Sequence, residues 1–149
     1  MKITFSTSIS CPPEKVFPWI AEPEKALLWQ KGVKKNEIIV DTPERVGTTF
    51  WEEMEEDGKT LEMNGIITEY VPNQSISFHL ESRIHRLDVS YSVTGDKNKS
   101  TIAVDTNIHW KFPMNVMSLF LGSKIREGIL RQTESELGEL KRLCEKDTR

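Results

Sequence analysis

The stretch that decides the fold is FPMNVMSLFLGSKIREGILRQTESELGELKRLCEKDTR, residues 112–149. Small and apolar residues recur through it in one broad stripe at helical spacing: Leu119, Gly122, Ile125, Ile129, Leu130, Thr133, Leu137, Leu140 and Cys144. This pattern predicts one long amphipathic helix. Its first two turns are apolar on nearly all sides, and two internal glycines each cost about 1 kcal/mol of helix stability, which favours a kink or an open space beside the helix.

The residues before this helix alternate between apolar and polar side chains, a pattern typical of half-buried strands. The first such run covers residues 3–9, and two short helices are predicted after it, over residues 13–20 and 23–30. From Val33 onward the sequence contains six further runs of this kind. They are separated by five turn signals, at residues 41–43, 57–58, 71–74, 81–83 and 95–98. We therefore expect an antiparallel meander of about seven strands, with Gly65 marking a bulge.

Length and composition favour a soluble protein with a single domain covering residues 1–149. A net charge of -3 and an isoelectric point near 5.7 argue against nucleic acid as the main partner. We recognise neither a signal peptide nor a stretch long enough to span a membrane, so we expect a cytoplasmic protein without membrane insertion. The histidines and the two cysteines show no metal-ligand spacing, so no metal site and no cofactor are expected, and the cysteines are expected to be reduced thiols.

Four parts of the sequence carry a family likeness: ISCPPEKVF at residues 9–17, residues 22–33 with their tryptophan, VGTTF at 46–50 with ITEYVP at 67–72, and residues 122–145. Together they span essentially the whole chain, and they resemble the START-like (SRPBCC) superfamily, which includes polyketide cyclases and dehydratases and the major birch pollen allergen. The resemblance implies an α+β helix-grip fold. In that fold a curved antiparallel sheet wraps around the C-terminal helix, and a hydrophobic cavity lies between them.

Strand parity predicts which side chains face this cavity, because successive residues of a strand point to opposite faces. The set expected to contact a ligand comes from the second short helix, the strands and the long helix: Trp29, Phe50, Met63, Ile67, Phe78, Leu80, Leu87, Val89, Tyr91, Val104, Thr106, Met117, Leu121 and Ile125. Two of them, Tyr91 and Thr106, carry hydroxyls that either orient a ligand or satisfy each other in the core.

Three polar residues are candidates for proton transfer: Glu52, His85 and Tyr91. Glu52 is in phase with the apolar residues of its strand, which would place a carboxyl group with a raised pKa inside the cavity. We favour the alternative, an outward orientation within the acidic run 52–57, because charged side chains are rarely buried without a partner. His85 follows a turn, and we expect it to be solvated at the strand end rather than to donate a proton at the cavity rim.

The sequence contains no nucleophile elbow, no glycine-rich phosphate loop and no Ser-His-Asp spacing. The leading hypothesis is therefore a protein that binds a small hydrophobic or lipid-like ligand in the cavity without strong catalysis. One alternative, implied by the resemblance, is a polyketide cyclase or dehydratase that acts on an aromatic or polyketide substrate. Another is a protein-interaction module similar to the activators of a heat-shock ATPase. The sequence leaves the ligand and the choice between monomer and homodimer open.

Overall fold

The computed structural model describes residues 1–56 and 58–147. In chain order the elements are β1 (Lys2–Ile9), α1 (Pro13–Ala21), α2 (Pro23–Ala26), β2 (Val33–Val40), β3 (Thr49–Glu56), β4 (Lys59–Val71), β5 (Ser75–Glu81), β6 (His85–Gly95), β7 (Ser100–Trp110) and α3 (Met114–Asp147). The predicted α+β helix-grip fold is confirmed. The second short helix ends earlier than predicted, at Ala26, and Trp29 lies in the turn that follows it.

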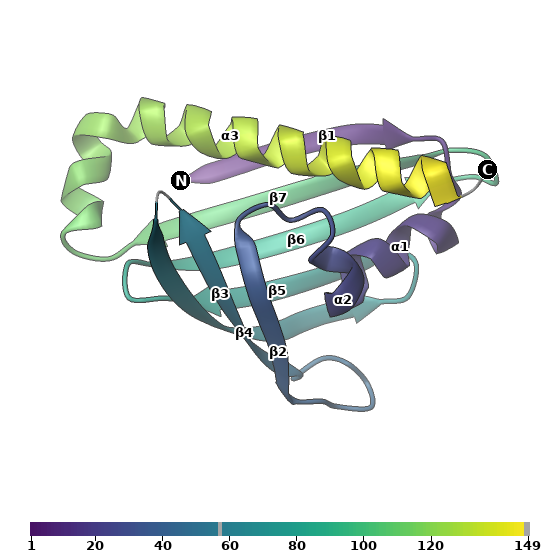
Figure 1. Ribbon diagram of the computed structural model, residues 1–149, viewed down its shortest axis with the longest axis horizontal. Helices are drawn as coiled ribbons and strands as arrows, with labels where there is room; N and C mark the ends of the chain where they lie inside the picture. Colours follow the sequence, from purple (N-terminus) through teal and green to yellow (C-terminus); the bar gives the residue numbers. More distant parts are fainter. Residues whose placement is uncertain (57, 148–149) are drawn as a thin grey trace.

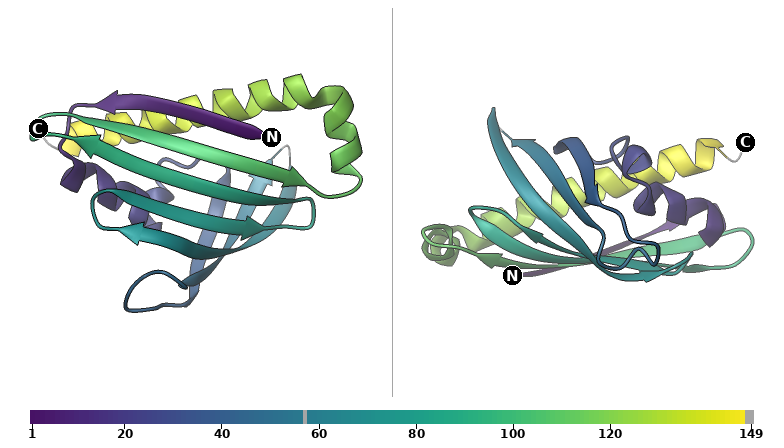
Figure 2. Two further views of the ribbon diagram at one scale, coloured as in Figure 1. Left: turned by 180° about the vertical axis from the view of Figure 1, so that it is seen from behind. Right: turned by 90° about the horizontal axis from the view of Figure 1, so that it is seen from below.

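The strands form one antiparallel sheet in the order β1-β7-β6-β5-β4-β3-β2. Each strand from β2 to β7 pairs with its neighbour in sequence, and β1 closes the far edge by pairing with β7. Figure 1 shows α3 lying across one face of this sheet. The view from below in Figure 2 shows that β2, β3 and β4 rise from the plane of the other strands, so the sheet curves around the helix.

The two short helices cover only one end of the concave face. Helix α1 starts at Pro13, where the missing N–H costs nothing, and Glu14 in its first turn suits the positive end of the helix dipole. It lies beside the C-terminal end of α3 (Figure 1), and its buried residues Val16, Phe17 and Ile20 belong to the main apolar cluster. That end of the molecule is therefore filled by side chains.

Gly65 does not mark a bulge, as the sequence pattern suggested, because β3 and β4 keep an unbroken register along their whole length. A Cβ atom on Gly65 would lie 2.3 Å from Phe50 Cζ, so glycine is needed where this ring packs against the strand. The register shift in this part of the sheet lies at Ile67–Glu69, between β4 and β5. At the predicted β3–β4 turn Gly58 has a φ of 76°, and Asp57 lies outside the described residues.

The first turns of α3 are bent relative to the rest of the helix (Figure 1) and leave large apolar side chains uncovered. Leu119 and Phe120 are each 82% exposed, and Phe112, just before the helix, is 79% exposed. Within the described residues, no helix combines the length and the apolar character that crossing a bilayer requires. The stripe predicted for α3 therefore becomes a buried face only beyond these turns.

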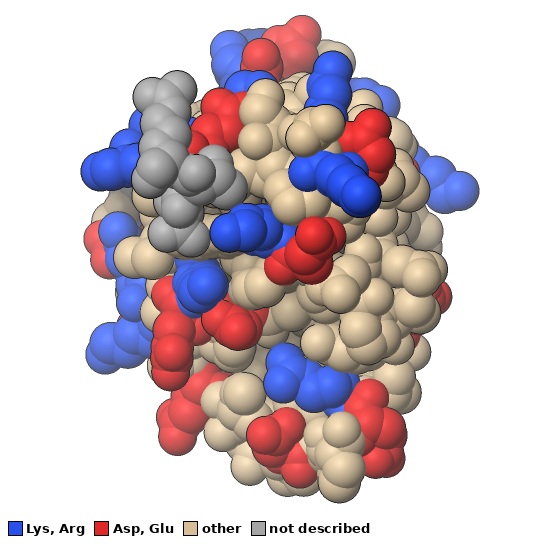
Figure 3. Space-filling model, turned by 90° about the vertical axis from the view of Figure 1, so that its right-hand side faces the viewer, with Lys and Arg blue, Asp and Glu red and all other residues tan. Residues whose placement is uncertain are grey.

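Charged side chains of both signs are interspersed over the end of the molecule that carries α1 and the C-terminal end of α3 (Figure 3). This mixture agrees with the small net charge of -3. Among the described residues of that face, no single sign gathers into the kind of basic patch that nucleic-acid binding requires.

Candidate functional site

A cavity of about 950 Å³ lies between the concave face of the sheet and α3. Eight of the predicted ligand-contact residues line it: Trp29, Met63, Leu80, Leu87, Val89, Tyr91, Val104 and Thr106. A second, smaller cavity of about 120 Å³ lies beside α1, α2 and β2, and it is lined by the predicted residues Phe50, Ile67 and Phe78. The two cavities share Gln30, Glu52, Leu80, Val89 and Tyr91, so these side chains form the partition between them.

The prediction for the helical side of the cavity is wrong, because Met117, Leu121 and Ile125 do not line it. Met117 is 46% and Leu121 45% exposed, because the first turns of the helix bend away from its long axis. The helix contributes a different set, which lies mostly further along the chain: Met114, Ile129, Gln132, Thr133, Glu136 and Leu137. Helical spacing identified the stripe, but it did not show where along the helix the sheet lies opposite.

Glu52 points into the cavity, so the outward orientation favoured from the sequence is wrong. Strand parity decides the outcome: Glu52 pairs with Met63 on β4, and both side chains line the main cavity. Burial raises the pKa of the Glu52 carboxyl from its usual 4.5 to about 7, and the charge of Glu136 acts in the same direction. The carboxyl is therefore poised to exchange a proton near neutral pH.

Glu136, on α3, is the second carboxyl of the cavity, and the sequence analysis missed it. Burial raises its pKa, while the backbone N–H of Lys31, 3.0 Å from Oε2, and the Gln132 side chain lower it. Its spacing was the available signal, because Glu136 follows Thr133 by three residues and precedes Leu140 by four, which places it on the stripe. Two carboxyl groups that repel each other thus face the same space.

Tyr91 stands beside this pair. Burial raises the pKa of its hydroxyl, the charges of Glu136 and Glu52 raise it further, and a hydrogen bond with Gln30 acts in the opposite direction. Its ring meets those of Trp29 and Phe78 edge to face, with centroid distances of 6.1 and 6.4 Å. The phenol therefore stays protonated and can act as a hydrogen-bond donor. In the described part of the chain, the Tyr91 hydroxyl forms no hydrogen bond with Thr106. The two hydroxyls therefore do not satisfy each other in the core, which was one of the two predicted roles.

His85 lines the main cavity and is only 9% exposed, so the prediction that it is solvated is wrong. Its ring packs against Trp110 with centroids 5.2 Å apart. The strand end is covered because the His85 side chain contacts Trp110 of β7 and Ser82 of the β5–β6 turn, which the sequence pattern at the turn did not reveal. The other two histidines lie at the surface: His79 is bonded to Asp88, and His109 is exposed.

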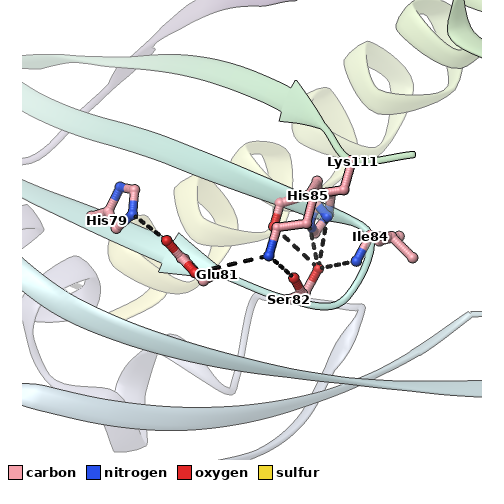
Figure 4. A network of polar contacts seen from close by, with 6 residues as sticks. All are labelled: His79, Glu81, Ser82, Ile84, His85 and Lys111. Atoms are coloured by element: carbon pink, nitrogen blue, oxygen red, sulfur yellow. Dashed lines mark hydrogen bonds and ion pairs between the residues drawn. The ribbon is translucent and has the colours of Figure 1, made fainter. Parts of the chain in front are cut away.

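The hydrogen bonds around Ser82 favour one tautomer of His85 (Figure 4). Ser82 Oγ accepts the backbone N–H of Ile84 at 3.2 Å and that of His85 at 3.1 Å. Its own proton has two acceptors, His85 Nδ1 at 2.7 Å and the His85 carbonyl at 3.3 Å, and the shorter contact favours the ring nitrogen. Burial lowers the pKa of His85, and the charge of Lys111, whose Nζ donates to the Ser82 carbonyl, lowers it further. The imidazole is therefore neutral at neutral pH, and these contacts favour the tautomer that carries its proton on Nε2.

Chemically, the cavity offers apolar walls, two carboxyls, a phenol and a neutral imidazole, a set suited to binding a ligand or moving a proton. Among the described residues, no group of three or more His, Cys, Asp or Glu side chains is arranged to hold a metal ion. Two polar atoms of the lining, Gln30 Oε1 and Trp110 Nε1, are buried without a hydrogen-bond partner in this part of the chain.

Comparisons with known proteins agree with this geometry. The sequence model of the family described as "Polyketide cyclase / dehydrase and lipid transport" matches residues 1–145. None of the curated proteins compared with the sequence is a match. Similar solved structures include the protein TTHA0849 from Thermus thermophilus, with 15% identity, a TM-score of 0.84 and 100% of both chains covered.

Two other similar structures have more descriptive names. The Zhui aromatase/cyclase from Streptomyces sp. R1128 has 13% identity and a TM-score of 0.79, over 100% of this chain and 96% of its own. A START superfamily protein from Mycobacterium smegmatis has 14% identity and a TM-score of 0.73, over 95% of this chain and 98% of its own. At such low identity these likenesses show the fold alone.

Proposed function

Because this chain belongs to the family described as "Polyketide cyclase / dehydrase and lipid transport", we propose that it binds a small hydrophobic or lipid-like molecule in its main cavity, without strong catalysis. The observation that carries this proposal is the cavity of about 950 Å³, which lies at the upper end of the sizes of ligand pockets. Its floor consists of apolar side chains such as Met63, Leu87 and Val104, whose contact with a ligand would remove apolar surface from water.

The test fills the cavity from its helical side. Ile129 lines the cavity on α3, so Ile129→Trp places a large ring inside it, whereas Arg131→Trp places the same ring on the exposed side of the helix. In a fluorescence titration with the neutral dye Nile red, we expect Ile129→Trp to weaken binding by about tenfold or more, which corresponds to about 1.4 kcal/mol. Arg131→Trp should bind the dye like the unmodified protein. Equal binding by all three proteins would contradict the proposal.

A specific observation favours a second candidate function, that of a cyclase or dehydratase on a polyketide-like substrate. A carboxyl whose pKa lies near 7 is suited to take a proton from the carbon beside a carbonyl, and Glu52 has such a pKa inside the cavity. His85 and Tyr91 supply N–H and O–H donors to the carbonyl oxygen.

This candidate is tested with a poly-β-ketone thioester, whose ring closure and loss of water produce an aromatic chromophore. Catalysis predicts that Glu52→Gln lowers the rate by about a hundredfold or more, because a general base contributes on the order of that factor. Glu53→Gln, on the opposite face of the same strand, should have no effect. A rate that equals the background in the unmodified protein would reject this function and leave the binding proposal in place.

A further inference from the structure

The lining of the main cavity is rich in hydrogen-bond acceptors near the partition. Glu52 comes from β3, Glu136 from the facing helix α3, and Gln30 from the turn before β2, and all three line the main cavity. Among the described residues, Glu52 has no hydrogen-bond donor, and only burial and the charge of Glu136 act on its pKa. Gln30 Oε1 is buried and also lacks a donor within the described residues. In the described part of the chain, this surface lacks a positive charge within ion-pair distance of the two carboxyls.

Among the described residues the cations supply that charge only in part, since the charge of Lys31 lowers the pKa of Glu136 from a distance. Lys31 gives its backbone N–H to Glu136, but its ammonium group bonds to Ser135 Oγ on the outside of α3. Lys59 and Arg83 also line the cavity, together with Glu55, but all three are exposed at its mouth. In the part of the chain that the structure describes, no Lys or Arg forms an ion pair with Glu52 or Glu136.

Aromatic rings line the same space. Trp29, Tyr91 and Trp110 all face the main cavity, and Trp29 and Tyr91 meet edge to face next to the carboxyl pair. The faces of such rings attract cations as well as apolar groups. Two carboxyls without an ion-pair partner among the described residues, beside indole and phenol rings in the same cavity, have the chemistry of a site for an organic ammonium ion.

We propose that the ligand of the main cavity is a hydrophobic amine, whose ammonium group lies between Glu52 and Glu136 and whose apolar body lies over Met63, Leu87 and Val104. This inference rests on the proposed binding function and specifies its ligand class. A neutral ligand would leave the two carboxyls to share a proton, because both cannot ionise side by side without a counter-charge. An ammonium ion removes the repulsion and supplies donors to Glu52 and to Gln30 Oε1, which have none among the described residues.

The proposal has a consequence for pH. An aliphatic ammonium, like that of lysine, stays protonated well above neutral pH, whereas the carboxyl of Glu52 has a pKa of about 7 in the ligand-free protein. Binding of the amine therefore strengthens as the pH rises from about 5 to about 8, and near neutral pH it releases a proton from the carboxyl pair. Among the described residues, the other charged or titratable side chains of the cavity lining belong to Lys31, Glu55, Lys59, Arg83, His85 and Tyr91.

The test compares three fluorescent probes of nearly the same shape: 1-naphthylmethylamine, which is cationic, 1-naphthylmethanol, which is neutral, and 1-naphthoate, which is anionic. Their affinities are measured by titration against the unmodified protein, Glu52→Gln, Glu136→Gln and the double variant. Glu53→Gln and Glu134→Gln are the matched controls, since they remove a carboxylate from the other face of the same strand and helix. Circular dichroism and urea unfolding verify that each variant is folded.

We expect the amine to bind at least about tenfold more tightly than the alcohol near pH 8, since a charge-assisted hydrogen bond contributes about 1.5–3 kcal/mol. That preference should fall about threefold or more in each single variant and vanish in the double variant. The affinity for the alcohol should stay unchanged in these variants, and the two control variants should keep the full preference for the amine. Equal or tighter binding of the alcohol or the anion by the unmodified protein would overturn the amine assignment and leave the hydrophobic cavity standing. Failure of all three probes to bind would overturn the binding function and the assignment together.

Discussion

The two ends of the interface between α3 and the sheet are built from the same elements and differ completely in packing. At one end Leu140 and Cys144 of α3 are buried with Cys11 and Ile102, each no more than 1% exposed. At the other end Ile129, Thr133 and Glu136 face a cavity of about 950 Å³. Leu137 marks the boundary between the two ends. It is 1% exposed, and it belongs both to the apolar cluster and to the cavity lining.

The difference comes from the short helices between β1 and β2. Helix α1 inserts Val16, Phe17 and Ile20 at the filled end, next to the C-terminal end of α3 (Figure 1). No helix of the described chain does the same at the open end, where the sheet is wider than α3 can cover. The position of the short helix α1 therefore decides which half of the interface between α3 and the sheet is filled core and which half holds the cavity.

The two ends of the interface between α3 and the sheet should differ most in how much a truncated side chain lowers the free energy of unfolding. Leu140→Ala should lower the free energy of unfolding by about 3 kcal/mol, because it leaves a new void in a filled core. Leu87→Ala should cost less than about 1.5 kcal/mol, because the removed atoms already border an open cavity. Urea unfolding of both variants measures the difference, and equal losses would show that the ends are packed alike.

The next effect concerns pH, since only the open end carries buried carboxyls. Below about pH 4.5 Glu52 is protonated in both the folded and the unfolded chain, and burial costs nothing. As the pH rises through about 7, the unfolded chain is already ionised while the folded chain must give up its bound proton, so stability is lost.

The loss that Glu52 contributes is at most about 3 kcal/mol above neutral pH, and Glu52→Gln should remove it. We therefore expect the variant to gain stability relative to the unmodified protein between about pH 5 and pH 8, as measured by urea unfolding at each pH. Glu53→Gln serves as the control on the other strand face. A difference between variant and unmodified protein that does not change with pH would mean that Glu52 is not buried in solution.

A smaller effect is expected at Ser82, which supports the strand end beside the cavity. Ser82→Ala should cost about 1–2 kcal/mol, because the backbone N–H groups of Ile84 and His85 lose their acceptor. Nitrogen NMR of the imidazole should show the Nε2–H tautomer of His85 in the unmodified protein and a mixture in the variant. Ser90→Ala, at an exposed site, is the control and should change stability by less than about 0.5 kcal/mol. An unchanged tautomer in Ser82→Ala would argue against the fixed imidazole.

The smallest effect compares the helix itself at the two ends. Gly128 and Gly138 have nothing within 4 Å of an added Cβ atom, and both are exposed. Alanine at either position should raise the free energy of unfolding by about 0.5–1 kcal/mol through its higher helix propensity. Thermal unfolding of the two variants measures this gain. A loss at Gly128 alone would show that α3 needs the glycine to bend over the open end.

The sequence predicted the parts of the molecule that depend on local pattern. Alternation and turn residues located the strands, and helical spacing located α3, because periodicity reports directly on which face of an element is covered. Parity also placed Leu87, Tyr91 and Val104 on the concave face, where the cavity lies. These predictions needed no knowledge of how distant elements pack.

The predictions that failed have a common physical cause. Whether a side chain is buried depends on the helix or strand that packs against it, which a local sequence pattern does not show. Parity placed Glu52 inward, but the general cost of burying a charge favoured the wrong orientation, since the open space and the facing Glu136 are invisible in a strand pattern. His85 was expected in solvent because the covering contacts, Trp110 among them, come from another strand. Leu121 was expected inside because the stripe does not show where α3 bends.

Methyl NMR with a neutral probe tests the contrast between the two ends most directly. With labelled Ile, Leu and Val methyl groups, addition of 1-naphthylmethanol should shift the signals of Ile129, Leu87 and Val104, which line the cavity. The signals of Leu140 and Ile102, at the filled end, should stay in place. Shifts spread equally over both ends, or no shift at Ile129, Leu87 and Val104, would contradict the account.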